Sequence, residues 1–314
     1  MDQLKIFTGR AHPELAAEIC SVLGVSLGQS EIFKFTNDNS FVKINESVRD
    51  ADVFVVQPSC QPVNDGLVEL LIMIDALKRA SVRRLTAVTT YFPYGRSDKK
   101  DQPRIAITAR LVADLLQVAG VDRILALDLH SPQIQGFFSV PVDHLTAVPI
   151  LAGYFSTKQL PDLVVVAPDA GRAKMARQFA RRLNAPMAII DKRRLDNQDS
   201  VAVEHIIGDV EGKRCLLIDD EISSGVSLVS AADTLARFGA VKIYAAVTHP
   251  ILSGMAPQRI LASKIDELVV TNSVPVPEAK RNHKITVLSI ANLVGEAIYC
   301  IHHGRSVSTV FEKE

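Results

Sequence analysis

The sequence predicts an α/β protein whose mainly parallel sheets are covered by helices on both faces. The first observation is that apolar runs of strand length alternate with segments of helical periodicity. The second is that these runs lack polar alternation, which is typical of strands buried on both faces of a sheet. The third is that one strand–turn–helix–strand pattern occurs twice in the chain, which predicts two domains of one fold.

Each predicted strand is a short, continuous apolar run. These runs cover residues 53–57, 85–89, 123–128, 163–167, 187–190, 215–218, 243–247 and 268–270. Helices are predicted where apolar residues recur at helical spacing between the runs, as over 66–79, 107–118 and 171–183. We therefore expect helical crossovers between parallel strands.

The repeat divides the chain. Residues 82–95 (VRRLTAVTTYFPYG) resemble residues 241–254 (VKIYAAVTHPILSG), and similar strand–turn–helix segments precede both. The offset of roughly 160 residues is too long for a solenoid repeat, so it indicates a duplicated domain. We place the boundary at 148/149, which gives domains 1–148 and 149–296, with the C-terminal segment 297–314 as a candidate to pack on the first domain.

Composition argues against several classes of protein. The 314 residues include 35 Lys+Arg and 35 Asp+Glu, so no net positive charge favours nucleic acid as a partner. The chain lacks an apolar run of about eighteen residues, so we expect no membrane span, and its N-terminus lacks a signal-peptide pattern. The four cysteines form no CxxC pair, which indicates neither zinc nor redox chemistry and fits a cytoplasmic location.

Three predicted strands run into acidic residues. Asp128 and His130 follow one strand, Asp169 follows another, and Asp219 with Asp220 follows a third. For one such aspartate, helix capping or turn formation is the simpler explanation. Ligands of open α/β sheets, however, bind beyond the carboxyl ends of the strands. Three acidic ends therefore predict hard oxygen ligands at one sheet edge, which suits Mg²⁺.

A turn of small residues follows the third acidic end. Ser223, Ser224, Gly225 and Ser227 precede a helical pattern that includes Leu228. Backbone N–H groups at such a helix start can bind an anion, and the acids upstream can accept hydrogen bonds from sugar hydroxyls. The motif therefore favours a phosphorylated sugar as ligand. The alternative is a helix that is simply capped by Ser223 or Ser224.

These motifs resemble those of class I ribose-phosphate pyrophosphokinases. The turn is similar to the phosphoribosyl pyrophosphate loop that this family shares with phosphoribosyltransferases. Further resembling segments follow in the family's order: YFPYGRSDKK (91–100), ALDLHSPQIQGFF (126–138), VVVAPDAG (164–171), IIDKRR (189–194), HIIGDVEGK (205–213), THPILSG (248–254) and SVSTVFE (306–312). The resemblance runs from about residue 4 to residue 312. It implies two tandem phosphoribosyltransferase-like, Rossmann-like domains.

The resemblance also implies an activity. Family members are ribose-phosphate diphosphokinases, which transfer the diphosphoryl group of ATP to the 1-hydroxyl of ribose 5-phosphate with Mg²⁺. The products are phosphoribosyl pyrophosphate and AMP. By motif match, Lys192 and Arg194 are the catalytic cations, and His130 and Asp169 are the metal positions. The family further implies a homo-oligomer built from dimers, a hexamer in particular, and the apolar segments YFPYG and GFFSVPV look exposed enough to form contacts.

The substrate positions are assigned by the same match. The ATP-binding candidates are Phe35, Asn37, Asp38, Asn39, Arg96, Ser97 and Lys99. The ribose 5-phosphate candidates are Asp219, Asp220, Ser223, Ser224, Gly225, Val226 and Ser227.

The chain departs from the family pattern at the substrate positions. Where the family loop usually reads Asp-Thr-Gly-Gly-Thr, Ser223 replaces the acid and Val226 replaces a small residue. Arg172 stands where a second glycine follows Asp169. These changes leave two interpretations open: an active enzyme with altered kinetics, or a regulatory homologue that modulates an active synthetase. The intact metal and cation positions favour the enzyme, and a single-domain phosphoribosyltransferase fits poorly.

Overall fold

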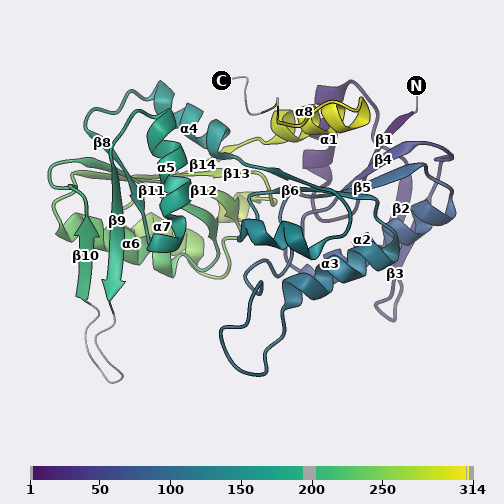
Figure 1. The fold of residues 1–314 in the computed structure, drawn as a ribbon, viewed down its shortest axis with the longest axis horizontal. Coiled ribbons are helices and arrows are strands. Elements are labelled where there is room, and N and C mark those ends of the chain that lie inside the picture. Colours follow the sequence, from purple (N-terminus) through teal and green to yellow (C-terminus); the bar gives the residue numbers. More distant parts are fainter. Residues whose placement is uncertain (1–2, 194–202, 309, 311–314) are drawn as a thin grey trace. The chain divides into compact units, whose positions relative to one another are not determined.

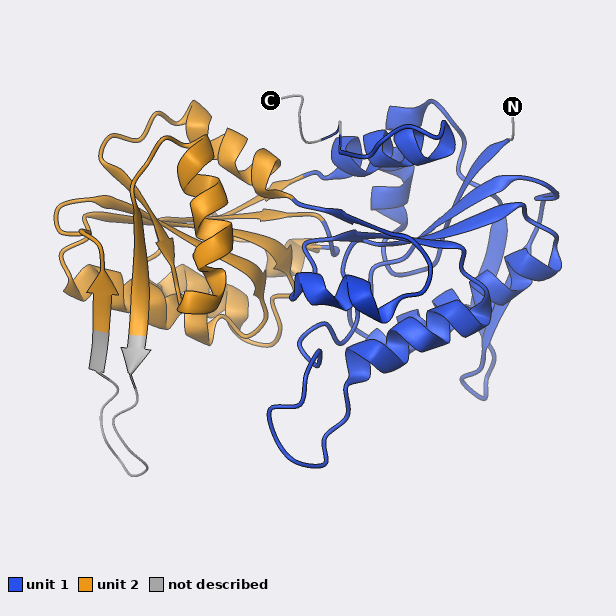
Figure 2. Ribbon diagram, viewed as in Figure 1, with its two compact units in different colours: residues 1–146, 273–275, 289–314 blue, residues 147–272, 276–288 orange. Residues whose placement is uncertain are grey.

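The chain forms two compact units. The computed structural model describes residues 3–193, 203–308 and 310. Unit 1 comprises residues 1–146, 273–275 and 289–314, and unit 2 comprises residues 147–272 and 276–288 (Figure 2). The expected domains were 1–148 and 149–296. The main difference is that residues 289–296 belong to unit 1 and not to the second domain. None of the described helices has the length and apolar character needed to cross a membrane.

Unit 1 is built on a five-stranded parallel sheet with the order β1-β4-β5-β6-β7 (Figure 1). The strands are β1 (Leu4–Thr8), β4 (Asp52–Val56), β5 (Arg84–Thr89), β6 (Arg123–Leu127) and β7 (Val142–Leu145). All five residues of β4 are buried, as expected for a central strand of a sheet covered on both faces.

Helices cover both faces of this sheet. They are α1 (Pro13–Leu23), α2 (Val63–Arg79), α3 (Thr108–Ala119) and α8 (Ala291–His302). Figure 1 shows α2 and α3 on one face, and α1 packs against α8 on the other. Leu67, Leu70, Ile74 and Leu77 recur at helical spacing along α2 and join one buried cluster with strand residues such as Val53.

Unit 1 also carries an antiparallel hairpin, formed by β2 (Ser30–Lys34) and β3 (Ser40–Ile44), which is a separate two-stranded sheet. Its inner residues, Ile32, Val42 and Ile44, pack on the same buried cluster as α2. The segment YFPYG, which looked exposed in the sequence, is partly core, because Phe92 is buried and its ring lies 5.9 Å from that of Phe138.

Unit 2 contains a seven-stranded sheet with the order β10-β9-β8-β11-β12-β13-β14. Its strands are β8 (Leu163–Ala167), β9 (Met187–Arg193), β10 (Val203–Ile207), β11 (Arg214–Ile222), β12 (Lys242–Pro250), β13 (Glu267–Thr271) and β14 (Ile285–Leu288). All pairs are parallel except β9 with β10.

Two pairs of helices cover the sheet of unit 2. They are α4 (Val148–Thr157) with α5 (Ala173–Arg182), and α6 (Val226–Arg237) with α7 (Ala256–Ala262). The second pair shares a buried cluster with Leu217 and Val247. Phe155 of α4 packs on Tyr244, which points to the other face because strand residues alternate.

The two units share a frame. The strand order β8-β11-β12-β13-β14 in unit 2 matches β1-β4-β5-β6-β7 in unit 1. In both, a helix and a hairpin are inserted between the first two of these strands along the chain, but only in unit 2 does the hairpin join the main sheet. The predicted α/β fold with repeated, mainly parallel sheets is therefore confirmed.

One boundary was predicted wrongly. The acids were expected after the end of a strand, but β11 continues through Asp219 and Asp220 to Ile222. The reason is that the neighbouring β12 is equally long, so the two strands remain paired as far as Ile222 and Pro250.

Candidate active site

Two adjacent carboxylates lie near the carboxyl end of β11, the strand between β8 and β12. The side chain of Asp220 is 3% exposed and that of Asp219 is 20% exposed. Charged carboxylates are costly to bury unless a cation or hydrogen-bond donors accompany them.

Arg172 supplies that cation. It ends the short 3₁₀ helix over Ala170–Arg172, which follows β8, and β8 is the direct neighbour of β11. Its Nε donates to Asp219 Oδ1 at 2.9 Å, and its Nη2 lies 2.6 Å from Asp220 Oδ1. The guanidinium therefore bridges both acids, an arrangement that the planar fork of arginine favours.

The protonation of Asp219 depends on this environment. The pKa of Asp219 is raised to about 7, chiefly by burial and also by the neighbouring Asp220, while the charge of Arg172 opposes both effects. Oδ1 of Asp219 accepts hydrogen bonds from Arg172 Nε and from the backbone N–H of Asp220.

The turn after β11 leads directly into a helix. Gly225 is the N-cap of α6 and has a left-handed backbone with φ of 77°, which glycine adopts without strain. The alternative of a serine cap is wrong, because α6 has no side-chain cap hydrogen bond. The first N–H groups of the helix thus remain suitable for an anion.

The side chains of this turn point in different directions. Ser223 Oγ lies 3.1 Å from Ser253 Oγ, in the loop after β12. Ser224 is exposed, and its carbonyl accepts a hydrogen bond from Arg259. Val226 is 55% exposed, so its bulk lies at the surface, and Ser227 is exposed as well.

The two predicted metal ligands lie in different units. Asp169 follows β8 in unit 2; it is exposed, and its Oδ1 accepts a hydrogen bond of 3.2 Å from the Arg172 backbone. His130 follows β6 in unit 1. The expectation that all the acids share one sheet edge is wrong, because β6 belongs to one sheet while β8 and β11 belong to the other.

The predicted catalytic cations lie on or beyond β9. Lys192 is on this strand, but its side chain is outside the described part of the structure. Arg194 lies outside the described residues.

Four of the ATP candidates lie at the tip of the β2–β3 hairpin. Phe35 is 49% exposed, and its ring contacts those of Phe33 and Phe41 at 5.1 and 5.7 Å. Asn37 orders the tip by accepting the N–H of Asn39 through its side chain at 3.2 Å. Asp38 and Asn39 line a cavity of about 410 Å³. The other residues lining it are Lys34, Ser40, Asn64, Asp65, Val68 and Ile72.

The remaining ATP candidates lie in the loop between β5 and α3. Arg96 and Lys99 are exposed. Ser97 instead contacts the start of α3, with its Oγ 3.3 Å from the hydroxyl of Thr108. Its side chain therefore helps to hold the loop against the helix.

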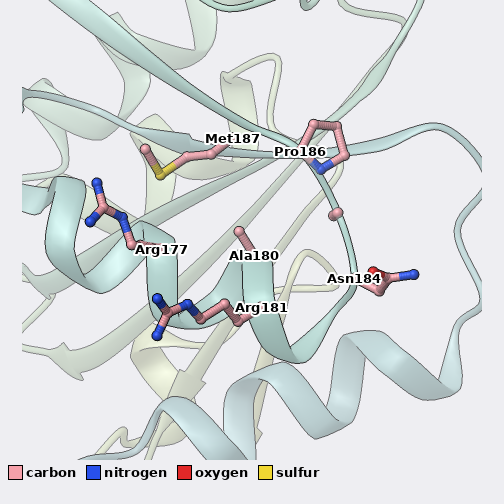
Figure 3. Close-up of a pocket in the computed structure, with 7 residues that line it drawn as sticks. Arg177, Ala180, Arg181, Asn184, Pro186 and Met187 are labelled. Atoms are coloured by element: carbon pink, nitrogen blue, oxygen red, sulfur yellow. The ribbon is translucent and has the colours of Figure 1, made fainter.

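Another cavity, of about 460 Å³, lies in unit 2 and is shown in Figure 3. The residues lining it are Arg177, Ala180, Arg181, Asn184, Ala185, Pro186 and Met187. Met187 begins β9, so this cavity lies at the amino ends of the strands, opposite the edge that carries Asp219. It is thus separate from the acid cluster.

Comparison with known proteins identifies the family. One family model, the N-terminal domain of ribose phosphate pyrophosphokinase, matches residues 4–120, and the phosphoribosyl synthetase-associated domain matches residues 202–312. A ribose-phosphate pyrophosphokinase of Caldanaerobacter subterraneus subsp. tengcongensis is 52% identical over 311 residues, which cover 99% of this chain and 98% of the relative. The chain belongs to the ribose-phosphate pyrophosphokinase family. The predicted family is therefore confirmed.

Other members of the ribose-phosphate pyrophosphokinase family agree with this assignment. A relative of the same name from Bacillus subtilis is 48% identical over 308 residues, covering 98% of this chain and 97% of the relative. The crystal structure of phosphoribosylpyrophosphate synthetase from Mycobacterium smegmatis matches with a TM-score of 0.92 and 44% identity, and the match covers 96% of this chain and 100% of that chain.

The sequence did not predict the ion pair of Arg172. It showed only that an arginine replaces a glycine of the family pattern. A charged residue in a loop beside a candidate acid site was the available signal, but its partners depend on β8 lying next to β11.

Proposed function

We propose that this chain transfers the diphosphoryl group of ATP to the 1-hydroxyl of ribose 5-phosphate, releasing phosphoribosyl pyrophosphate and AMP. The observation that carries the proposal is the pairing of a partly exposed carboxylate, Asp219, with the open N-terminus of α6 a few residues later. Relatives about half identical over nearly the whole chain are ribose-phosphate pyrophosphokinases, which supports this reaction.

The sugar phosphate is bound by β11 and the turn that follows it. Asp219 and Asp220 accept hydrogen bonds from the ribose hydroxyls. Residues 223–227 surround the 5-phosphate with backbone N–H groups and with the hydroxyls of Ser224 and Ser227. Placing the acids on the strand and the phosphate at the helix start keeps like charges apart.

Mg²⁺ fits the donor atoms of the predicted metal positions. Asp169 offers an exposed carboxylate with one oxygen engaged by a backbone N–H, and hard oxygen ligands are those Mg²⁺ prefers. Asp169 would bind the ion, whose charge offsets that of the triphosphate, and His130 stays a prediction from the family resemblance. Lys192 and Arg194 stabilise the charge of the transferring group, and the hairpin tip with Arg96 and Lys99 binds ATP.

A homo-oligomer built from dimers, a hexamer in particular, is the expected assembly in the cytoplasm. Its support is the family and the aromatic cluster at the hairpin tip, where Phe35 remains half exposed. Light scattering of the purified protein tests this expectation. A fully active monomer at assay concentration contradicts it.

The decisive experiment for the activity measures AMP release from ATP, Mg²⁺ and ribose 5-phosphate by the purified protein. The proposal expects AMP and phosphoribosyl pyrophosphate in equal amounts, dependent on both substrates. The regulatory alternative expects an inactive protein that changes the rate of an added active synthetase, and that result overturns the proposal.

A further inference from the structure

The bridge between Arg172 and the acid pair is where this chain differs from the family pattern most consequentially. The inference drawn from it rests on the proposed function, because it concerns how the same site binds its sugar. Arg172 replaces a glycine, whereas Ser223 replaces an acid. The sugar subsite therefore has one positive charge more and one negative charge fewer than the family pattern.

The position of Ser223 shows that its hydroxyl does not replace the missing acid. Its Oγ lies 3.1 Å from Ser253 Oγ, and its carbonyl accepts the Ser253 N–H at 3.0 Å. The residue therefore ties the turn to the loop after β12. Sugar recognition rests on Asp219 and Asp220.

The geometry of Arg172 leaves room for a ligand on the acids. Its Nε donates to Oδ1 of Asp219, and its Nη2 lies 2.6 Å from Oδ1 of Asp220. A carboxylate can accept about four hydrogen bonds, so one guanidinium contact on each does not exhaust them. Held by one oxygen, the Asp219 carboxylate has a fixed rotation, and 20% of its side chain remains exposed.

We propose that Arg172 is a positioning residue for the sugar: it orients Asp219 and Asp220 as charged acceptors for two hydroxyls on adjacent carbons of a pentose 5-phosphate. Selectivity for ribose over a deoxypentose follows. A sugar hydroxyl that donates a hydrogen bond to an oriented, charged carboxylate contributes binding free energy, and a deoxypentose that lacks this hydroxyl loses that contribution. Without Arg172, the two neighbouring buried carboxylates repel each other and one is protonated, so the pair loses an acceptor.

The charges that act on Asp219 are few. Among the described residues they are chiefly Asp220 on the same strand and Arg172 from the 3₁₀ helix. Arg172 is the member of this set that lowers the pKa of Asp219. Its removal therefore raises that pKa above about 7, so the acid is ionised only at higher pH.

The test compares Arg172→Gly and Arg172→Lys with wild type. The matched control is Arg177→Ala, which removes an exposed arginine of unit 2 at the opposite edge of the sheet. We measure kcat and KM with ribose 5-phosphate and 2-deoxyribose 5-phosphate between about pH 6 and 9. Calorimetry gives the affinity for ribose 5-phosphate without ATP, and circular dichroism checks folding.

The expected result is a KM for ribose 5-phosphate that rises roughly ten-fold in Arg172→Gly, with kcat within about two-fold of wild type. The acidic limb of kcat/KM should move to higher pH, and selectivity against the deoxy sugar should fall. Arg172→Lys should restore part of each effect because lysine keeps the charge but not the fork. Arg177→Ala should match wild type.

Two results overturn the inference. Tighter sugar binding in Arg172→Gly would show that the arginine blocks the acids, and an unchanged pH profile with unchanged selectivity would show that it only packs. If the glycine variant does not fold, Arg172→Lys and the coupling between Arg172→Lys and Asp219→Asn decide, because a positioning role requires the two changes to be non-additive. An inactive wild type that also fails to bind ribose 5-phosphate refutes the proposed function instead.

Discussion

Unit 1 and unit 2 share one strand order, but they differ in the polar side chains at the carboxyl ends of their strands. In unit 1, Gln57 is the first polar residue after the apolar run of β4, as Asp219 is after the apolar run of β11. Gln57 is fully buried; its amide donates to Glu69 at 3.0 Å and to the Gly66 carbonyl at 3.3 Å. Glu69, on α2, also accepts the backbone N–H and Nε of Arg10 at 2.7 and 2.6 Å.

In unit 2 the corresponding edge carries a pair of carboxylates. Asp219 is partly exposed and is paired with Arg172 of the 3₁₀ helix after β8, and α6 starts at Val226 with no acidic residue in its first turn. Glu69 of the following helix thus holds the polar side chain in unit 1, whereas in unit 2 Asp219 is paired with Arg172 and keeps 20% of its side chain exposed. The same arrangement of strands can therefore serve the fold or a ligand. The difference depends on whether the helix after the strand carries a side chain, such as Glu69, that binds the polar group.

The largest expected difference between the units concerns their hairpins. Lys192→Ala, on β9, should lower kcat by about 10²-fold or more with a smaller change in KM, because its charge acts mainly in the transition state. Steady-state kinetics measure this. Lys43→Ala, an exposed lysine on the hairpin strand β3 of unit 1, is the control and should leave kcat unchanged. An unchanged kcat in Lys192→Ala would remove this residue from the mechanism.

The next effect comes from giving unit 2 the residue of unit 1. Asp219→Gln removes a charged acceptor, and a charge-assisted hydrogen bond contributes about 1.5–3 kcal/mol. We expect the KM for ribose 5-phosphate to rise by roughly one to two decades at saturating ATP. Gln57→Asp in unit 1 is the reverse exchange. It should not create a second sugar site, and equilibrium dialysis that detects one would contradict the distinction drawn between the edges.

A smaller effect, on stability, is expected from the edge of unit 1. Glu69→Gln removes the charge that holds Arg10 and Gln57, and we expect a loss of about 1–3 kcal/mol in the free energy of unfolding. Urea denaturation measures it, with the exposed Glu31→Gln on β2 as control. The kcat/KM of folded Glu69→Gln should equal that of wild type. A selective loss of activity at unchanged stability would give this edge a role in the reaction.

The smallest effect is a gain. Ser223→Asp restores the acid of the family loop, and we expect the affinity for ribose 5-phosphate to rise by about ten-fold. The gain is small because the charge of Arg172 already acts on the carboxylates of this site. Titration of ribose 5-phosphate at saturating ATP measures it. No change in Ser223→Asp together with lost activity in Glu221→Gln would mean that Glu221 supplies the acid instead.

The sequence predicted the buried parallel strands well, because their apolar runs have little polar alternation. The predicted strand 163–167 coincides with β8. Strands at the margins were missed: β14 has four half-buried residues, and β10 ends the sheet of described strands, where it pairs with β9. Neither has the continuous apolar run that marks a strand covered on both faces.

For the candidate site, the acid pair and the turn into α6 were predictable from local spacing. The contact of Arg172 with Asp219 was not, since it joins a 3₁₀ helix and a strand 47 residues apart in the sequence, through the adjacency of β8 and β11. The assignment of His130 and Asp169 to one sheet edge failed for a related reason. An acid after a buried strand has the same local pattern whichever sheet the strand joins, and the repeat in the chain supplies two sheets.

The packing of α8 on α1 has a consequence for synthesis of the protein. The two helices approach so closely that a Cβ at Gly295 would lie 2.8 Å from Cγ1 of Val22. Unit 1 contains residues on both sides of unit 2, whose residues all lie between 147 and 288. Domains generally fold in the order of their synthesis. Here all of unit 2 precedes α8 (Ala291–His302) in the chain, so during synthesis α1 lacks its neighbouring helix until after the residues of unit 2 have been made.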